Sequence, residues 1–330
     1  MEGMLIDPLV IVRDFHLAST VIVAGIIFFD LLIVPPIWRM KPPFGSTRAS
    51  FRSSAGKVLW VSLAVSIASA LAWLCLLSMR IGHKGFDDVI ADGTVWLVLS
   101  QTQFGLAWQL RLLFGGLLAA SLLLSRTAGN TRIAHGLRLL SALFASAYLG
   151  SLAFAGHGTE GLGSWQDIHL AADCLHLIAA GLWLGALIPL VLLLVYLSRF
   201  REDGWALAAA RAGSRFSTLG ILAVGVLLVS GIINAAFLLG GMHSLIDTGY
   251  GRLLLSKVVL FAAMVSLAGV NRQYLLPRLS RHLGADQAAG TVQKLVRSAL
   301  VEIALGLTIV CIVGLLGIMP PANDMAAHMH

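Results

Sequence analysis

Histidine and carboxylate side chains recur at helical spacing in this sequence and are the groups best suited to bind a metal ion. His169, Asp173 and His176 are spaced at i, i+4 and i+7, which places all three on one face of an α-helix, and Trp183 continues the stripe at i+14. Two imidazoles and a carboxylate on one stripe can ligate a metal directly, or the carboxylate can orient an imidazole ligand. We expect Asp173 to orient rather than to ligate. The alternative interpretation is a hydrogen-bonded polar seam between helices.

Thioether and imidazole side chains also occur together. Met242 precedes His243, and the C-terminal residues include Met325, His328 and His330. Copper is the metal that selects this pair of ligand types, and the thioether favours Cu(I). The sequence therefore predicts a site for copper, as Cu(I) or Cu(II), and a C-terminal tail that captures the metal. A tail without a metal-binding role is the alternative.

The composition predicts the elements that must position these groups. Of the 330 residues, 58% are hydrophobic and 12% are charged, whereas about 25% of residues are charged in a typical soluble domain. A helix needs about 20 apolar residues to cross the hydrocarbon core of a bilayer. We therefore expect an all-α polytopic membrane protein with eight spans, at 9–34, 57–79, 104–125, 135–156, 168–197, 216–239, 252–271 and 296–318.

The distribution of charge predicts the orientation of these spans. The loops after spans 1, 3, 5 and 7, with the adjoining helix ends, hold 17 of the 23 Lys and Arg residues and 5 of the 16 acidic residues. That face carries +12 and the opposite face −5, within a total of +7. Because basic loops stay in the cytoplasm, both termini are expected outside the cytoplasm. The basic excess thus reports topology and gives no support to nucleic-acid binding.

With this orientation, eight of the ten histidines fall in the outer halves of the spans or outside them. His16 and His176 lie inside spans 1 and 5, and we expect them to hold copper between the two halves of the chain. His169 is expected to contribute a further ligand. His157, which lies between two glycines at the end of span 4, and His243 are expected at the mouth of the site.

Ionisable groups inside a span cost about 2.5–3.5 kcal/mol each on insertion scales, so they usually face the bundle interior or a wet cavity. Asp14, Asp173, Arg111 and Lys257 belong to the same outer third of the spans. We expect these residues and Trp183 to support the metal ligands. Arg111 and Lys257 are expected either to anchor Asp residues or to form a positive barrier to passage.

Two pairs of segments match at the same spacing. A Thr-x-aromatic-Gly motif is followed by a cation nine residues after the Thr in 102–111 and in 248–257. A His followed nine residues later by Gly occurs at 16–25 and at 176–185. The chain is therefore expected to consist of two parallel four-helix repeats, related by a pseudo-two-fold axis along the membrane normal. The two expected repeats are residues 1–156 and 157–330.

The sequence lacks the motifs of common catalytic and nucleotide-binding sites. It contains no G-x-x-x-x-G-K-[ST] phosphate loop, no H-E-x-x-H, no G-x-S-x-G and no C-x-x-C. We therefore expect a protein that is not an enzyme and that does not drive transport with a nucleotide.

A set of motifs spread over the chain is typical of one family. The motifs are Gly231-Ile-Ile-Asn234, Thr248-Gly-Tyr250-Gly251-Arg-Leu-Leu-Leu-Ser-Lys257, Asn271-Arg272, Leu276-Pro277-Arg278-Leu279, Gly156-His157, Asp173-x-x-His176, Trp183-Leu-Gly185 and Pro320-Pro321. With them, essentially the whole chain resembles the copper resistance protein D (CopD) family. The resemblance implies an eight-span bacterial inner-membrane protein that handles copper, often with a periplasmic copper-binding partner of the CopC type.

Our leading hypothesis is a protein that receives copper at its periplasmic face and transports it towards the cytoplasm. One alternative is an electron-transfer protein in which two histidines on separate spans ligate a b-type haem. Another is a copper sensor or assembly scaffold without transport. The sequence leaves open the oxidation state of copper, the driving force, the oligomeric state, and whether His16 and His176 face a common site.

Overall fold

The computed structural model describes residues 7–40, 44–155, 164–239, 243–281 and 285–319. Within these ranges every regular element is a helix and no strand is present, which confirms the expected all-α class. The helices before residue 156 are α2 (Pro8–Leu32), α3 (Val34–Trp38), α4 (Gly45–Gly82), α5 (Phe86–Ala91), α6 (Thr94–Gln101), α7 (Gln103–Thr127), α8 (Thr131–Gly150) and the short 3-10 helix η1 (Ser151–Ala155).

The helices after residue 163 include two π-helical segments that continue longer helices without a break. In chain order they are α9 (Ser164–Ala180), the π-helical η3 (Gly181–Gly185), α10 (Ala186–Phe200), α11 (Trp205–Leu238), α12 (Ser244–Asp247), α13 (Gly249–Val270), the π-helical η4 (Asn271–Leu275), α14 (Leu276–Arg281) and α15 (Ala285–Leu316). Because π-helical turns are rare and occur frequently at functional sites, η3 and η4 mark places of interest.

Eight helical stretches among the described residues are long and apolar enough to cross a membrane, which confirms the eight expected spans. Several are longer than the hydropathy pattern predicts: the second begins at Gly45 instead of residue 57, and the sixth at Trp205 instead of residue 216. In both cases the added turns contain Arg or Lys residues, whose long side chains can reach water from a helix end. The apolar stretch therefore underestimates the helix.

The early start of α4 has a specific cause in the loop between α10 and α11. The Glu202 carboxylate accepts hydrogen bonds from the backbone N–H groups of Ser46 (2.9 Å) and Thr47 (3.1 Å), which are free donors at the first turn of α4. Burial acts to raise the pKa of Glu202, but the hydrogen bonds from Thr47 and Ser46 outweigh it and hold this pKa below its usual value. Glu202 thus joins the two parts of the chain.

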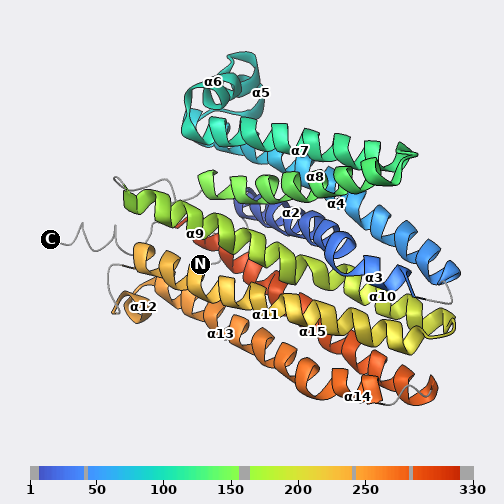
Figure 1. Cartoon of the computed structure of the whole chain (residues 1–330). Helices are drawn as coiled ribbons and strands as arrows, with labels where there is room; N and C mark the ends of the chain where they lie inside the picture. Colours follow the sequence, from blue (N-terminus) through green and yellow to red (C-terminus); the bar gives the residue numbers. More distant parts are fainter. Residues whose placement is uncertain (1–6, 41–43, 156–163, 240–242, 282–284, 320–330) are drawn as a thin grey trace.

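Helix α2 lies in the middle of the bundle and packs against α4, α8, α10, α15 and η3 (Figure 1). The start of α2 and the end of α15 lie at the same end of the bundle, which we call the terminal end. The closest approach is between α2 and η3: a Cβ on Gly25 would overlap the backbone of Gly185, and one on Gly185 would overlap the carbonyl of Val21. Both positions require glycine because small residues allow helix backbones to touch.

The two Thr-x-aromatic-Gly motifs begin helices α7 and α13 in the same way. Thr102 and Thr248 are the N-cap residues, and each side-chain hydroxyl accepts a hydrogen bond at 2.9 Å from the N–H of the motif glycine, Gly105 or Gly251. Such a cap satisfies one of the free N–H donors of a first helical turn. The motif therefore fixes where each helix begins, and with it the depth of the cation that follows.

Candidate metal-binding sites

His16 is fully buried in the first half of the chain, and both of its ring nitrogens have partners. Nδ1 lies 2.9 Å from the backbone carbonyl oxygen of Ser66 on α4. A carbonyl only accepts, so Nδ1 carries the proton and donates it. Nε2 faces Arg111 on α7 and accepts a hydrogen bond from Nη2 of the guanidinium. His16 is thus a neutral imidazole, and the lone pair on its Nε2 already accepts a hydrogen bond.

Arg111 has an exposed fraction of 1% and binds to the end of α8 as well as to His16. Its Nη1 donates to the backbone carbonyl of Tyr148 and to the hydroxyl of Ser151, both at 3.0 Å. The guanidinium carbon also lies 4.7 Å from the centre of the Tyr148 ring, in a cation–π arrangement. Arg111 therefore connects α2, α7, α8 and η1, and it anchors a histidine instead of the expected Asp.

Aromatic side chains close the remaining space around His16. The ring centres of Trp73 and Trp108 lie 5.8 Å and 5.9 Å from that of His16. Phe104 stacks on Trp108 at 4.4 Å, and the Trp108 indole N–H donates to the Ala70 carbonyl at 2.9 Å. These contacts exclude water from the imidazole. A metal ion could reach Nε2 of His16 only by displacing Arg111.

The predicted stripe of α9 is one face of the helix, and it packs against α11. The three contacts are the stacking of His169 on Phe237 at 4.8 Å, the hydrogen bond from Asn234 Nδ2 to Asp173 Oδ1 at 3.0 Å, and the contact of His176 Nδ1 with Ser230 Oγ at 2.9 Å. The partners descend α11 by three and four residues as the stripe ascends α9, so the two helices run antiparallel with matched faces.

His176 is half-buried, and its tautomer follows from Ser230. The Ser230 hydroxyl donates its one proton to the Val226 carbonyl, so towards His176 it must accept. Nδ1 of His176 is therefore the protonated nitrogen, and Nε2 has the lone pair that a metal ion requires. A Cβ on Gly231 would lie 3.5 Å from Cε1 of His176, so glycine leaves room beside the ring.

Charged and polar groups of α13 act on the stripe of α9. Lys257 on α13 is half-buried, and its charge acts on both His176 and Asp173. Tyr250, at the start of α13, lies within the electrostatic range of Asp173. Asp173 is thus placed to offset the positive charge of Lys257 and of an incoming cation.

Trp183 continues the stripe into η3, as the spacing predicts. It has an exposed fraction of 2% and meets Phe261 of α13 edge to face, with ring centres 5.8 Å apart. Gly220 of α11 lies beside the indole ring. Trp183 therefore packs between α11 and α13 on the side of the bundle that His176 faces, but seven residues further from the terminal end.

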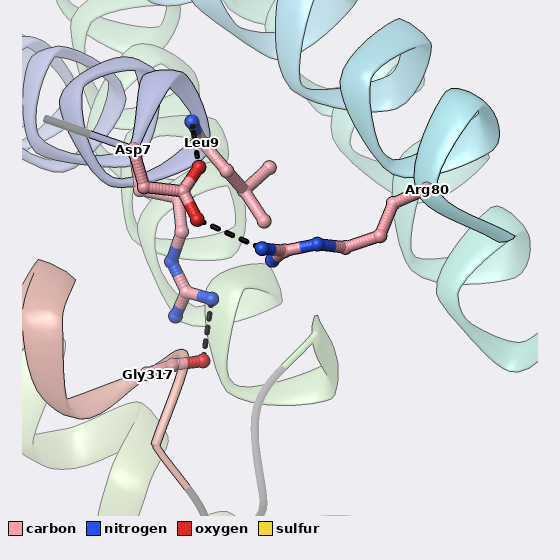
Figure 2. Close-up of polar contacts among 5 residues, drawn as sticks. Asp7, Leu9, Arg80 and Gly317 are labelled. Atoms are coloured by element: carbon pink, nitrogen blue, oxygen red, sulfur yellow. Dashed lines mark hydrogen bonds and ion pairs between the residues drawn. The ribbon is translucent and has the colours of Figure 1, made fainter. Parts of the chain in front are cut away.

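Ion pairs and hydrogen bonds at the terminal end join α2 to α4 and α15. Arg80 reaches Asp7 at 2.8 Å, and Arg13 Nη1 donates to the Gly317 carbonyl at 2.6 Å (Figure 2). The Arg13 guanidinium also lies 4.7 Å from the centre of the Trp73 ring. These contacts fix the end of α2 that leads to His16.

Asp14 faces away from His16. Its carboxylate hydrogen-bonds with the Cys311 thiol on α15 and lies against Gly314, and Arg13 is its nearby positive charge. Asp14 therefore supports the packing of α2 on α15, and no described contact joins it to Arg111.

The structure does not bring His16 and His176 into one site, because His16 faces α4 and α7 whereas His176 faces α11. Within the described ranges there is no group of three or more His, Cys, Asp or Glu side chains arranged to hold a metal ion. Haem ligation by two histidines needs imidazoles that face each other, so the haem alternative gains no support. His243 is exposed just before α12. The remaining predicted ligands, His157, Met242, Met325, His328 and His330, lie outside the described residues.

Several residues that shape these sites were not predicted. Ser66, Ser230 and Trp108 are uncharged residues inside spans, and their types alone do not separate them from ordinary helix-packing residues. Glu302 is different: it is a carboxylate within the eighth span with an exposed fraction of 1%. The signal in the sequence that identifies Glu302 is the same as for Asp14, the cost of an ionisable group inside a span.

Comparison with known families finds two matches that together cover most of the chain. Residues 4–167 match the family model "copper resistance protein D-like, N-terminal domain", and residues 210–316 match "copper resistance protein D". No solved structure matches the chain.

Three relatives are similar over long alignments. Copper resistance protein D of Pseudomonas syringae pv. tomato is 30% identical over 267 residues, which cover 78% of this chain and 84% of the relative. Inner membrane protein YebZ of Escherichia coli (strain K12) is 31% identical over 309 residues, covering 94% of this chain and 97% of the relative. Copper transport protein CutJ of Bacillus subtilis (strain 168) is 31% identical over 224 residues, covering 66% of this chain and 40% of the relative.

Proposed function

The chain belongs to the copper resistance protein D family, and we propose that it receives copper at its periplasmic face and transports it across the inner membrane towards the cytoplasm. A role in copper handling follows from the family, and a multi-pass inner-membrane location from the eight apolar helices and the relative named as an inner membrane protein. The direction of transport and the site are our proposal. The name of one relative, copper transport protein, supports it.

We propose that the terminal end of the bundle faces the periplasm. The support is the charge distribution: 17 of the 23 Lys and Arg residues belong to the loops and helix ends at the opposite end. This orientation places the stripe of His169, Asp173 and His176 in the periplasmic half of the bundle. Copper arriving from the periplasm would meet His243 and the C-terminal tail before it reached the stripe.

We also propose that the chain is a pair of parallel repeats. Three observations support it: the equivalent caps at Thr102 and Thr248, the contact between the equivalent glycines Gly25 and Gly185, and the use of Nδ1 by both histidines to reach the second span of their own half. Equivalent residues that touch each other are the signature of a two-fold relation.

The observation that carries the proposed function is the state of His176. Its Nδ1–H is held by Ser230, so its Nε2 carries the lone pair that a metal requires, and no described hydrogen bond engages that nitrogen. A hydrogen bond at one imidazole nitrogen that orients the other towards the metal is the usual arrangement at metal sites. His169, about 10 Å along the helix, is too far to share one ion with His176. We propose that it acts as a separate step on the path of copper.

The proposal includes a periplasmic donor and excludes a catalytic step. A copper-binding protein of the CopC type would load the outer mouth near His243, and the chain would bind and move the ion without acting as an enzyme. A transfer experiment tests the proposed donor. The donor loaded with Cu(I) or Cu(II) is mixed with the purified protein, the two are rapidly separated, and the copper bound to each is measured.

Copper uptake into proteoliposomes tests the proposed function directly. The wild-type protein is expected to take up copper above the level of protein-free vesicles, and His176→Ala is expected to fall to that level. His135→Ala is the matched control, because His135 is exposed on α8 and is expected to leave uptake unchanged. Copper bound without uptake in the wild type would support a scaffold instead, and undiminished uptake by His176→Ala would remove the site.

A further inference from the structure

A cavity of about 210 Å³ lies between α11 and α13, and no described histidine lines it. Its walls are mostly apolar and include Leu187, Phe216 and Val265. Its polar lining is concentrated where η4 meets α15, at Asn271, Arg272 and Glu302. The second of the two π-helical segments therefore begins at this cavity, at the residue that contacts Glu302.

Glu302 and Asn271 form a hydrogen-bonded pair with two unused atoms. Glu302 has an exposed fraction of 1%, and its Oε1 accepts a hydrogen bond from Asn271 Nδ2 at 2.7 Å. Among the described residues, neither Oε2 of Glu302 nor Oδ1 of Asn271 has a hydrogen-bond partner, although both atoms are buried. Two buried acceptors without a donor are unfavourable, and a buried carboxylate without a counter-ion is more so.

Within the part of the chain that the structure describes, no basic side chain forms an ion pair with Glu302. Arg272 is the one other charged residue that lines the cavity, and its Nη1 donates to the Ser217 hydroxyl at 2.9 Å, on α11. The residues of η3, α10, α11, α14 and α15 that line the cavity with Glu302 are otherwise uncharged.

The other neighbour of α15 is α2, and its charged groups are engaged elsewhere. Asp14 lies against Gly314, about 18 Å along α15 from Glu302. Asp30 lies 4.0 Å from Arg138 of α8. Both are acids and cannot neutralise a carboxylate, and Arg13, the basic residue of α2, donates to the Gly317 carbonyl, about 22 Å along the chain direction of α15 from Glu302.

We propose that Glu302 and Asn271 form a proton-binding site that opens to the cavity. A proton on Oε2 turns the carboxyl group into a hydrogen-bond donor. The acceptor is Oδ1 of Asn271, whose amide nitrogen already donates to Glu302. The acid and the amide then form a ring of two hydrogen bonds that satisfies both unused atoms and removes the buried charge. The site offers only oxygen atoms and no thioether or imidazole, so it is suited to bind a proton and poorly suited to bind Cu(I).

The site lies in the half of the bundle away from the terminal end, whereas the histidine stripe lies near that end. Release of the proton would leave a carboxylate beside the cavity, and uptake would neutralise it. A site that alternates between these states can couple proton movement to the motion of η4 against α15. The proton site itself does not depend on the proposed copper function, because its residues and its test involve no copper.

Labelling with dicyclohexylcarbodiimide tests the proposal in the copper-free, full-length protein in detergent micelles. This apolar reagent adds to protonated carboxyl groups in water-poor surroundings, and it can reach Glu302 through the apolar cavity. Mass spectrometry of the digested protein is expected to locate an adduct at Glu302, with a yield that falls as the pH rises. Asp286, whose side chain is fully exposed, is the internal control and is expected to stay unlabelled.

The variant Glu302→Gln tests whether the site binds a proton and not another cation. A glutamine amide can replace the protonated acid in the ring, donating to Asn271 Oδ1 and accepting from Nδ2, so this variant is expected to keep its unfolding temperature while labelling is lost. Glu302→Leu, which removes the ring, is expected to unfold at a lower temperature. Absence of label in folded wild-type protein at all pH values, or protection from labelling by Na⁺ at constant pH, would overturn the proposal; protection by Na⁺ would assign a metal cation to the site.

Discussion

His16 and His176 stand at matching places in the two halves of the chain, and each holds its Nδ1 proton against a group on the next span. They differ at Nε2. In the first half Arg111 donates to this nitrogen, and Trp73 and Trp108 seal the ring. In the second half the corresponding cation, Lys257, acts on the imidazole only through its charge, and the ring is half-buried.

If the two halves are the repeats proposed above, the difference indicates how two copies of one unit divide their tasks. Arg111, with its planar set of donors, suits a fixed structural role because it can hold several acceptors at once. Lysine is a flexible point charge that can move when a cation enters. We infer that the first half uses its histidine to hold helices together and that the second half keeps its histidine for the metal.

Loss of the Arg111 side chain should have the largest effect and would sharpen the comparison most. Arg111→Ala removes hydrogen bonds to His16, Tyr148 and Ser151 and leaves Nε2 of the buried His16 without its donor. We expect a loss of unfolding free energy of about 3 kcal/mol or more, seen as a lower unfolding temperature in detergent. Lys257→Ala should cost clearly less. Equal losses would contradict the division between the halves.

Adding a single methyl group should disrupt the packing of α2 against η3, where the two halves of the chain meet. Gly25→Ala would place a Cβ on the backbone of Gly185, so we expect a loss of about 1–3 kcal/mol, the usual cost of overpacking. Gly116→Ala on α7 is the matched control, because nothing lies within 4 Å of its added Cβ. Thermal unfolding of both variants measures the effect, and a Gly25→Ala protein as stable as the control would show that α2 and η3 are not packed as described.

The serines that hold the two histidines offer a chemical comparison. Ser230→Ala removes the acceptor of His176 Nδ1–H, and we expect copper affinity to fall by about 10–100-fold, as for other groups that orient a metal ligand. Ser66→Ala should leave copper affinity unchanged, because His16 donates to the backbone carbonyl of Ser66. Competition with a chromophoric copper chelator gives both affinities. A Ser230→Ala protein with the copper affinity of the wild type would contradict the assignment of the metal to His176.

The smallest expected effect is at Glu202, which joins the halves at the opposite end of the bundle. Because the folded protein lowers the pKa of Glu202, its contribution to stability is full above the pKa of the unfolded chain and is lost as the pH falls through the folded value. Glu202→Gln should therefore lower the unfolding temperature slightly at neutral pH and not in acid. A variant whose deficit is the same at both pH values would show that the charge of Glu202 is not what caps α4.

The sequence predicts the spans well because length and hydropathy determine them. It also predicts the stripe of His169, Asp173 and His176, since a spacing of four and three residues fixes one helix face. The rotation of α2 about its axis could not be predicted in this way. The spacing of residues within α2 does not determine whether His16 faces α4 or η3. That choice depends on Gly25, whose contact with Gly185 fixes which side of α2 meets the second half.

Other features depend on contacts between residues distant in the chain. The start of α4 at Gly45 is set by Glu202, which lies more than 150 residues later. The closed state of His16 depends on Arg111, which is predicted to lie at a suitable depth but not to point at an imidazole. Glu302 was within reach of sequence reasoning, since it is a carboxylate inside a span, but its pairing with Asn271 requires the packing of η4 on α15.

The most direct test of the central claim compares the Cu(I) affinities of His16→Ala and His176→Ala in the purified, full-length protein, with folding verified by size-exclusion chromatography. Removal of a metal ligand should cost more than the roughly 100-fold upper range for an orienting group. We therefore predict a loss of more than about 100-fold for His176→Ala and an affinity close to wild type for His16→Ala. A large loss in His16→Ala, or none in His176→Ala, would contradict the assignment of copper to the second half.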